Sequence, residues 1–489
     1  MRRALLLAFI QTALYSSVLA KFNPLHHSGP AAPYFNAPPQ FGISDETPPG
    51  CVVDQAAYIV RHGARYPEPG GSVDGWESLF AKFQSSDYTA SGSLAFMPSW
   101  TPAIDAMANE PLYLTTAGAM EAFNLGVELR QRYGLTQGGD NLTVWSASQQ
   151  RVEDTASYFL DGYLSQGNFL LNKTLNRGTI VTLPDSVNFT FANSLTPGNG
   201  CPLYPTGDKS ALANTFRASY QPAIAQRLNT MLDGLELNVT DIGPMMDLCG
   251  FQTVINGNKE FCGIFTDDEW LDYEYADDLN YYYGSGPGNP FSAVVGFPYV
   301  KAVTDLLVVG PNKTTNGSTI IPPNLLMSFT HDNNIPPIVS ALGIWNESTV
   351  SPLSPTTPNT QRHFRSSFLV NFLGHIAIER LSCDQPLPFS VKHVAGQIVP
   401  RPGKSSDTKQ YVRIRINDAP VPVPGCTSGP GSTCPLSDFA DYVTERGKTI
   451  GNFVDVCGLK NVSNATSSVT FFTDFPPNST VFTPLPEAM

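Results

Sequence analysis

Three short apolar segments, 56–60, 142–145 and 325–330, share one pattern of hydrophobic and polar positions. Each has the continuous apolar character of a strand that is buried on both faces of a parallel sheet. Apolar positions at helical spacing follow the second and third segments, over 152–163 and 335–342. Ligands of open α/β sheets bind where the carboxyl ends of such strands meet. We therefore expect one site there, built from the charged residues that follow the strands: Arg61, His62, Arg65, Arg151, His331 and Asp332.

A further helix is predicted over 114–134. The segment Leu114-Thr115-Thr116 supplies a hydroxyl cap at its start, and Gly134 can end it. Its apolar positions are Met120, Phe123, Leu125 and Leu129.

Over 184–311 the sequence pattern changes to polar, helix-like stretches, and no further apolar strand is followed by charged residues and a helix. We expect a mainly helical insertion that covers the sheet edge. Alternating segments at 366–378 and 411–416 predict further strands. The predicted fold is α/β: a mixed sheet flanked by helices, formed by 51–183 and 312–489, with a smaller, mainly α-helical inserted domain.

Residues 1–20 have the charged start, apolar stretch and small-residue cleavage site of a secretory signal peptide. Polar residues interrupt the apolar stretch before it could span a bilayer, and no later segment is expected to be transmembrane. Residues 21–50 are rich in proline and predict an extended arm that packs over the surface or onto a partner subunit in a homo-oligomer. An unstructured tail is the alternative.

Two residue counts favour an extracellular or cell-wall location. Eight cysteines without a Cys-x-x-Cys pair predict four disulfides in an oxidising compartment. Their spacing favours Cys249–Cys262 and Cys426–Cys434 and leaves the other two open. Ten Asn-x-Ser/Thr sequons predict an N-glycosylated, secreted protein. Their asparagines are Asn141, Asn172, Asn188, Asn238, Asn312, Asn316, Asn346, Asn461, Asn464 and Asn478.

The formal net charge of −13 has the opposite sign from that of a typical nucleic-acid-binding protein. An acidic surface with few lysines is compatible with solubility at low pH. We therefore expect neither nucleic acid nor a membrane as a partner.

Segment 61–67 has the sequence RHGARYP and places one histidine between two arginines. Guanidinium groups match phosphate oxygens through paired hydrogen bonds, and an imidazole nitrogen can act as a nucleophile. Gly63 allows the backbone to approach a ligand closely. A solvated basic turn would explain a single R-H-G, but the agreement of the whole segment with one chemical plan favours anion binding.

Cleavage of a phosphate ester needs a nucleophile, positive charge on the phosphoryl oxygens and an acid for the leaving alcohol. His62 fits the nucleophile. Asp332 fits the acid, and it can then help to activate the water that hydrolyses a phosphohistidine. The side chains that can bind the phosphate are Arg61, Arg65, Arg151 and His331. Because an aspartate is protonated most readily near its reference pKa of about 3.9, activity should favour acid pH.

Other interpretations have less support. The sequence has no Gly-x-Ser-x-Gly elbow, no Walker-A loop and no dense His/Asp cluster, so we expect no metal and no cofactor. Arg151 alone would suit a surface salt bridge, and the pair at 331–332 alone would suit a helix cap. The acidic residues at 267–272 are interpreted as a solvated helix face, with a specificity loop as the alternative.

The RHGxRxP segment, Arg151 in its Ser-Ala-Ser setting and the His331-Asp332 pair resemble the secreted histidine acid phosphatases of the fungal type, a group that includes phytases. The resemblance extends over nearly all of the mature chain. It implies an α/β domain with a smaller helical domain, a phosphohistidine at His62, proton donation by Asp332 and catalysis without a metal. The phosphate-binding residues that it implies are Arg61, Arg65, Arg151 and His331.

The substrate is expected to be a small phosphate monoester, because the acidic stretch at 267–278 and the scarcity of lysine near the motifs resemble acid phosphatases of broad specificity. Phytate remains a possible substrate, and a dedicated phytase is the alternative. Phosphoryl transfer between metabolites is disfavoured by the signal peptide and the sequons. A non-catalytic phosphate-binding or cell-wall glycoprotein is disfavoured because both His62 and Asp332 are present.

Overall fold

The computed structural model describes residues 21–104, 110–134, 142–164, 178–185, 190–204, 210–311, 313, 317–345, 352–384, 391–394, 397–400, 408–476 and 478–482. The predicted signal peptide, 1–20, lies outside the described residues. Six of the ten sequon asparagines also lie outside them, and the four that the structure describes are exposed: Asn238, Asn461, Asn464 and Asn478.

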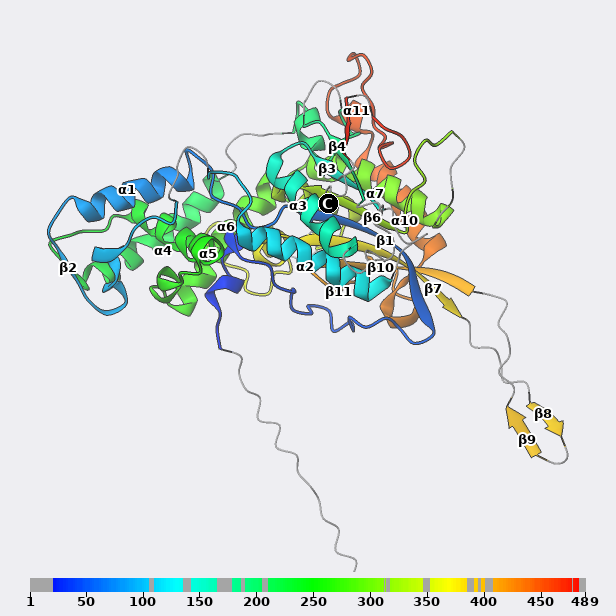
Figure 1. Ribbon diagram of the computed structural model, residues 1–489, viewed down its shortest axis with the longest axis horizontal. Helices are drawn as coiled ribbons and strands as arrows, with labels where there is room; N and C mark the ends of the chain where they lie inside the picture. The colour runs from blue at the N-terminus through cyan, green and yellow to red at the C-terminus, as the bar shows by residue number, and fades with distance from the viewer. Residues whose placement is uncertain are drawn as a thin grey trace, which may run out of the picture.

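A mixed sheet forms the centre of the described chain, as the sequence predicted (Figure 1). Its strand order is β11-β10-β7-β1-β6-β3-β4-β13, with β12 paired to β10. The strands β1, β6, β3 and β4 are parallel, and the others pair antiparallel. Their bounds are β1 Cys51–Arg61, β3 Thr143–Ala147, β4 Thr179–Leu183, β6 Leu325–Thr330, β7 His375–Asp384, β10 Thr408–Ile416, β11 Ala419–Val421, β12 Cys434–Pro435 and β13 Thr480–Phe482.

Helices cover both faces of this sheet. Adjacent residues of a strand point to opposite faces. In β6, the ring of Phe329 lies 5.4 Å from that of Phe159 in α3, whereas the hydroxyl of Ser328 lies 3.3 Å from the hydroxyl of Tyr299 in α7. The helices α3 and α7 therefore lie on opposite faces. The helix α2 (Thr116–Tyr133) packs on α3 (Gln150–Leu164). The helices α8 (Pro336–Leu342) and α10 (Leu436–Ile450) pack on α7 (Ser292–Val309).

A second group of helices lies at one side of the sheet (Figure 1). It consists of α1 (Ser72–Gln84), α4 (Ala211–Asn229), α5 (Val239–Asn256) and α6 (Asp267–Gly284), with a small ribbon of β2 (Thr89–Ala90) and β5 (Leu232–Asp233). Below, we call these elements the helical group. We predicted a helical insertion over 184–311. That boundary stays a prediction, but α1 precedes it and packs on α5, whereas α7 falls inside it and packs on α8.

The remaining elements are short. They are α9 Ser366–Leu369, α11 Phe453–Val456, the hairpin of β8 Val391–Val394 and β9 Gln397–Pro400, and 3₁₀ turns at Pro24–His26, Gly29–Ala31, Gly92–Leu94, Met97–Ser99, Pro197–Gly200, Glu260–Gly263, Asp332–Asn334 and Pro430–Ser432.

The predicted helix at 114–134 is confirmed as α2. The hydroxyl of Thr115 accepts a hydrogen bond from the Gly118 N–H at its start, and Gly134 adopts a left-handed conformation at its end. Leu125 and Leu129 are buried as expected, but Met120 and Phe123 are exposed. These last two residues flank the stripe that packs on α3 and do not enter the core.

The prediction of a strand over 366–378 is wrong at its start. Residues Ser366–Leu369 form the helical turn α9, and β7 begins only at His375. The cause is tertiary: the backbone N–H and the hydroxyl of Ser366 both donate to Asp278 of α6, which fixes a turn at this point.

The helix α7 also corrects an expectation. Its length and its mean hydropathy of 1.5 match those of a membrane span, although no later segment was expected to do so. However, 61% of that segment is buried, largely against its neighbours α8 and α10. Such burial is typical of a core helix.

The proline-rich arm at 21–50 packs on its own chain, so the alternative of an unstructured tail is wrong for the described residues. The N–H of Ala37 donates to Asn417 O, and Ala32 O accepts from Phe372 N. The N–H of Gly29 donates to Ser367 Oγ. The arm therefore packs against α9 and the segment that links it to β7.

The two predicted local disulfides, Cys249–Cys262 and Cys426–Cys434, are confirmed. The two that spacing left open are Cys51–Cys383 and Cys201–Cys457. The first joins the beginning of β1 to the end of β7, and the second closes a loop of 256 residues.

Candidate active site

Three parallel strands bring the predicted residues to one end of the sheet. In the register of β1 with β6, Arg61 lies beside Thr330, and the His62 N–H donates to Thr330 O at 2.9 Å. The last residues of β3 pair with β6 at the same level, through Ser146 and Phe329. The residues that follow these strands are therefore neighbours in space, although up to 271 positions separate them in the chain.

His62 is buried, and its ring is fixed by one hydrogen bond. The Nδ1 atom lies 2.9 Å from the carbonyl oxygen of Gly63. Because a carbonyl can only accept, Nδ1 bears the hydrogen, and in the neutral ring Nε2 keeps a free lone pair. Burial lowers the pKa of His62 well below its usual value, and the neighbouring Arg61, Arg65, Arg151 and His331 lower it further. These shifts favour the neutral, nucleophilic form of the ring.

Close backbone packing explains the glycine that follows. A Cβ on Gly63 would lie 2.7 Å from the carbonyl oxygen of Gly118 in the first turn of α2. The Gly63 N–H also donates to Thr155 Oγ1 of α3 at 3.0 Å. The next carbonyl, Ala64 O, accepts from both the N–H and the hydroxyl of Thr115. The loop is thus held between the first turn of α2 and Thr155 of α3.

Arg61 is held in place by the N-terminal arm and by the segment after α9. Its guanidinium donates to the backbone oxygens of Pro30 and Val370 and lies 4.5 Å from the ring centre of Phe372. Its other terminal nitrogen lies 3.2 Å from Asp332 Oδ2. A permanent cation is therefore held rigidly beside the carboxyl group.

Arg65 and Arg151 complete a cluster of three cations with Arg61, which we call the arginine cradle. Arg65 donates to Tyr66 O at 2.9 Å and to Glu68 Oε1 at 3.1 Å. Burial, and next the charge of Arg61, lowers the pKa of Arg65 to about 10, so it remains charged in acid solution. Burial also lowers the pKa of Arg151.

His331 stands between the arginine cradle and a carboxylate that the sequence analysis did not identify. Its Nδ1 lies 3.4 Å from an Arg151 nitrogen, and its ring meets that of His62 edge to face at 5.7 Å. Its Nε2 lies 3.8 Å from Oδ2 of Asp185, which follows β4. Asp185 follows β4, the fourth parallel strand, just as the predicted site residues follow β1, β3 and β6. The same pattern of a charged residue after a strand could therefore have indicated it.

Asp332 accepts two hydrogen bonds in addition to its ion pair with Arg61. Tyr281 of α6 donates its hydroxyl to Oδ2 at 2.8 Å, and the Asn333 N–H donates to Oδ1 at 2.8 Å. Burial alone would raise the pKa of Asp332, but Arg61, Arg65 and the Tyr281 hydrogen bond lower it below the usual value. In the absence of a bound anion, Asp332 is therefore a stabilised carboxylate.

The acidic run that precedes Tyr281 has two different environments. Asp267 and Asp268 lie exposed in the first turn of α6, so the interpretation as a solvated face holds there. Farther along the helix, Glu274 and Asp278 are buried and form ion pairs with Arg362. The specificity-loop alternative has no support in these contacts.

Four buried nitrogen atoms around the centre have no hydrogen-bond partner among the described residues. They are Nε of Arg61, Arg65 and Arg151, and Nε2 of His331. Because buried donors are almost always paired in native proteins, such a cluster indicates the place of a ligand. A tetrahedral oxyanion fits it, since guanidinium groups match phosphate oxygens in charge and geometry.

Among the described residues, no group of three or more His, Cys, Asp or Glu side chains is arranged to hold a metal ion.

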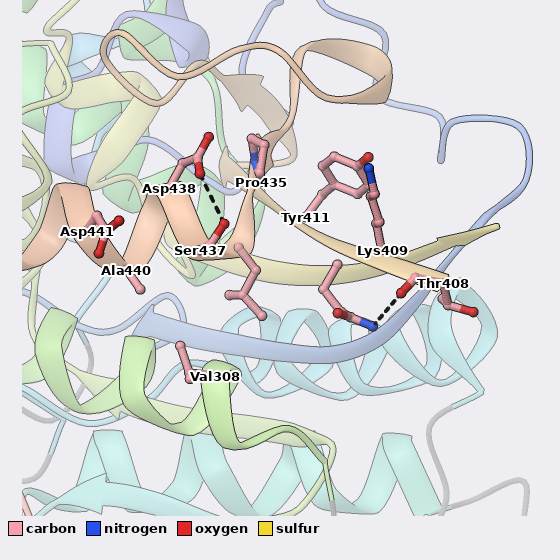
Figure 2. A pocket seen from close by; sticks show the side chains of 11 residues that line it. Val308, Thr408, Lys409, Tyr411, Pro435, Ser437, Asp438, Ala440 and Asp441 are labelled. Carbon is pink, nitrogen blue, oxygen red and sulfur yellow. Dashed lines mark hydrogen bonds between the residues drawn. The ribbon is translucent and has the colours of Figure 1, made fainter. Parts of the chain in front are cut away.

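A groove of about 680 Å³ lies at the other end of the sheet (Figure 2). It is lined by Val308, 408–411, 435–438, Ala440 and Asp441. Thr408 pairs with Asp384 at the level where β1 begins. None of the six predicted site residues lines this groove.

Comparisons with known proteins agree with this geometry. The family model described as the histidine phosphatase superfamily (branch 2) matches residues 52–417. A phytase from Candida albicans is 30% identical over 93% of this chain and 91% of its own length. A repressible acid phosphatase from Saccharomyces cerevisiae is 29% identical over 91% of this chain and 89% of its own.

Solved structures show the same fold. The crystal structure of the phytase from D. castellii superimposes with a TM-score of 0.77 at 27% identity, over 95% of this chain and 94% of that one. A multiple inositol polyphosphate phosphatase from Bifidobacterium longum, in complex with phosphate, has a TM-score of 0.59 at 12% identity, over 91% of this chain and 100% of that one. The second likeness concerns the fold alone.

Proposed function

The chain belongs to branch 2 of the histidine phosphatase superfamily, and on that basis we propose that it is an acid phosphatase that hydrolyses phosphate monoesters through a phosphohistidine at His62. One observation supports this proposal most strongly. A buried, neutral imidazole with its Nδ1 bound to a carbonyl oxygen stands beside three arginines whose Nε atoms have no partner among the described residues.

In the first step, Nε2 of His62 attacks the phosphorus atom and the bond to the ester oxygen breaks. Arg61, Arg65 and Arg151 neutralise the charge on the three equatorial oxygens. Asp332 gives its proton to the departing oxygen, so the alcohol leaves neutral. The products of this step are the alcohol, a phosphohistidine and an ionised Asp332.

In the second step, a water molecule attacks the phosphohistidine from the side that the alcohol has left. Asp332 accepts the proton of this water, the bond between Nε2 and phosphorus breaks, and inorganic phosphate departs. Both His62 and Asp332 then regain their starting states, so the cycle consumes only the ester and one water molecule.

The two pKa shifts support chemistry in acid solution. The lowered pKa of His62 favours the unprotonated nucleophile as the pH falls. The lowered pKa of Asp332 means that the protonated acid forms only at low pH in the free protein. A bound phosphate anion compensates the charge of Arg61 and thereby raises the pKa of Asp332 in the complex.

We propose a broad specificity for phosphate monoesters, with phytate as a lesser substrate. Glu68, whose side chain is 57% exposed, pairs with Arg65, and Asp185 lies beside His331. These two carboxylates lie beside residues of the phosphate site, where they repel a substrate that bears many phosphates more than a substrate that bears one. A dedicated phytase is the second candidate, because relatives with 27–30% identity bear that name.

The mechanism is tested with His62→Ala and with a rapid quench in alkaline detergent, which preserves a phosphohistidine. Wild-type enzyme mixed with a phosphate-labelled aryl ester should retain label that is stable in alkali and labile in acid, as a phosphohistidine is. His62→Ala should retain no label and should lose turnover, whereas the control His363→Ala, whose ring stacks on Phe41 of the N-terminal arm, should behave as wild type. Turnover of His62→Ala at the wild-type rate would refute the mechanism, and no turnover of any monoester by the wild type would favour a phosphate-binding role.

The specificity is tested with Glu68→Gln. We expect kcat/KM for phytate to rise about tenfold and kcat/KM for an aryl phosphate to change less than twofold, because one negative charge acts more strongly on the more highly charged substrate. A wild type that hydrolyses phytate far better than aryl phosphates would refute broad specificity and favour the dedicated phytase.

We further propose that the protein is secreted and N-glycosylated, and that it acts outside the cell or in the cell wall. The signal-like residues 1–20, four disulfides and the exposed sequon asparagines support this. Oligomerisation through the arm at 21–50 stays a prediction. Sedimentation of the secreted protein before and after enzymatic removal of N-glycans tests both points.

A further inference from the structure

The two oxygens of Asp332 have different surroundings. Oδ2 accepts from the Tyr281 hydroxyl at 2.8 Å and lies 3.2 Å from an Arg61 nitrogen. Oδ1 accepts only the Asn333 N–H, at 2.8 Å, among the contacts of the described residues. Since a carboxylate oxygen has about two lone-pair positions, Oδ2 is filled and Oδ1 has one position left.

We propose that Tyr281 is a positioning residue for the catalytic acid: together with Arg61 it occupies Oδ2 of Asp332, so that Oδ1 bears the proton delivered to the leaving group. This inference rests on the proposed function. Tyr281 does not contact the reacting atoms itself. It determines which oxygen of Asp332 is free and where that oxygen points.

The helix α6 holds Tyr281 firmly enough for this role. At its end, the N–H groups of Ser285 and Gly286 both donate to Tyr281 O, at 3.0 and 2.7 Å. Less than one turn earlier, Asp278 is buried and accepts from Arg362 and from both the N–H and the hydroxyl of Ser366. The tyrosine therefore has a fixed backbone and a fixed neighbouring turn.

The same contacts also align Arg61 with Tyr281. From Ser366 the chain continues to Val370, whose oxygen accepts from the Arg61 guanidinium, and to Gly374, whose oxygen accepts from the Arg61 N–H at 2.8 Å. Both donors to Oδ2 are thus held by one continuous segment bound to α6. The helical group in this way determines the geometry of an acid that the sheet supplies.

The charges that face this pair come from four places. Arg61 at the end of β1, Arg65 in the following loop and His331 before the acid all act on Asp332, and Asp277 of α6 acts on Tyr281. Burial, and next the charge of Asp332, raises the pKa of Tyr281 well above its usual value. Tyr281 is therefore a permanent donor over the whole acid range.

Tyr281→Phe removes this donor and keeps the ring. The lost hydrogen bond to a charged group should move the alkaline limb of kcat/KM by about one unit to higher pH, because that limb reports the ionisation of the acid in the free enzyme. We also expect kcat for an alkyl phosphate to fall about tenfold, because Asp332 can then turn away from the leaving oxygen. KM should stay within twofold.

The matched control is Tyr283→Phe in the same helix, because the Tyr283 hydroxyl donates to Leu353 O at 2.7 Å. Its pH profile should superimpose on that of the wild type. An unshifted profile for Tyr281→Phe, or an equal shift for Tyr283→Phe, would overturn the inference.

A second readout needs no turnover. In protein labelled at its aspartate carboxyl carbons, the NMR resonance that Asp332→Asn removes should titrate at higher pH in Tyr281→Phe than in the wild type, and identical titrations would overturn the inference. Failure of the proposed function is distinguishable, since it would appear as an inactive wild type whatever this titration gives.

Discussion

The role of Asp332 as the proton donor predicts a loss that depends on the leaving group. Asp332→Asn keeps the size of the side chain and removes both its proton and its charge. An alkyl phosphate has a strongly basic leaving oxygen that needs the proton, whereas a nitrophenyl phosphate has a weakly basic one that departs almost unaided. The variant should therefore discriminate between these esters far more than the wild type does.

The structure indicates the size of this effect. General acids contribute about 10²–10⁴-fold to the rate. Three contacts at 2.8–3.2 Å orient Asp332, so we expect a loss of about 10³-fold in kcat/KM for the alkyl ester, or about 4 kcal/mol. Loss of the negative charge beside Arg61 should at the same time favour binding of the phosphate dianion, so KM should be unchanged or lower.

The assay compares kcat/KM for both esters, since this ratio covers every step up to formation of the phosphohistidine. For the nitrophenyl ester the variant should lose less than tenfold in kcat/KM. Asp305→Asn is the control, because Asp305 forms an exposed pair with Lys301 on α7. Equal losses of kcat/KM for the two esters would refute the assignment of Asp332 as the acid.

Three further predictions concern stability and packing. Gly63→Ala should lower Tm and abolish most activity, because its Cβ would lie 2.7 Å from the backbone oxygen of Gly118; a wild-type Tm and kcat would contradict the close packing. Asp418→Asn should destabilise the protein most above about pH 4 and progressively less at lower pH, because the hydrogen bonds and charges around Asp418 lower its pKa in the folded state. Urea unfolding at several pH values measures the loss of stability. An equal loss at every pH would contradict the prediction. Removal of the Cys51–Cys383 disulfide should lower the free energy of unfolding by about 6 kcal/mol from loop entropy, because its cysteines are 332 positions apart. Removal of Cys249–Cys262, whose cysteines are 13 positions apart, should lower it by about 3 kcal/mol. The opposite order in chemical denaturation would show that effects on the native state dominate.

Local sequence patterns were sufficient for the parts of the site that one strand and its following residues determine. The apolar runs before Arg61 and His331 fixed strand positions, and parallel pairing then brought their ends together. The same reasoning failed at Ser366, because a turn there depends on Asp278, which is 88 positions away. Patterns of hydrophobicity report which residues are buried, but not which distant partner satisfies them.

Tyr281 shows the same limit within the site. It lies in an aromatic and acidic helix whose polar residues suggested exposure to solvent, yet it is half-buried against the core and bound to Asp332. Its neighbour Asp278 is buried because Arg362 supplies the opposite charge. A buried ion pair is invisible in a single sequence, since each partner alone has the composition of a surface residue.

The charge balance of the site connects its two steps. Without a bound phosphate, the carboxylate of Asp332 is the anion that offsets Arg61, at 3.2 Å. An arriving phosphate dianion takes over that role, so the carboxylate loses its electrostatic support and accepts a proton, which is the form that the first step requires. When the alcohol has left with this proton, Asp332 is again a carboxylate and can accept the proton of the attacking water. The lowered pKa of the acid in the empty site is therefore compatible with its function as a donor, because substrate binding itself reverses the shift.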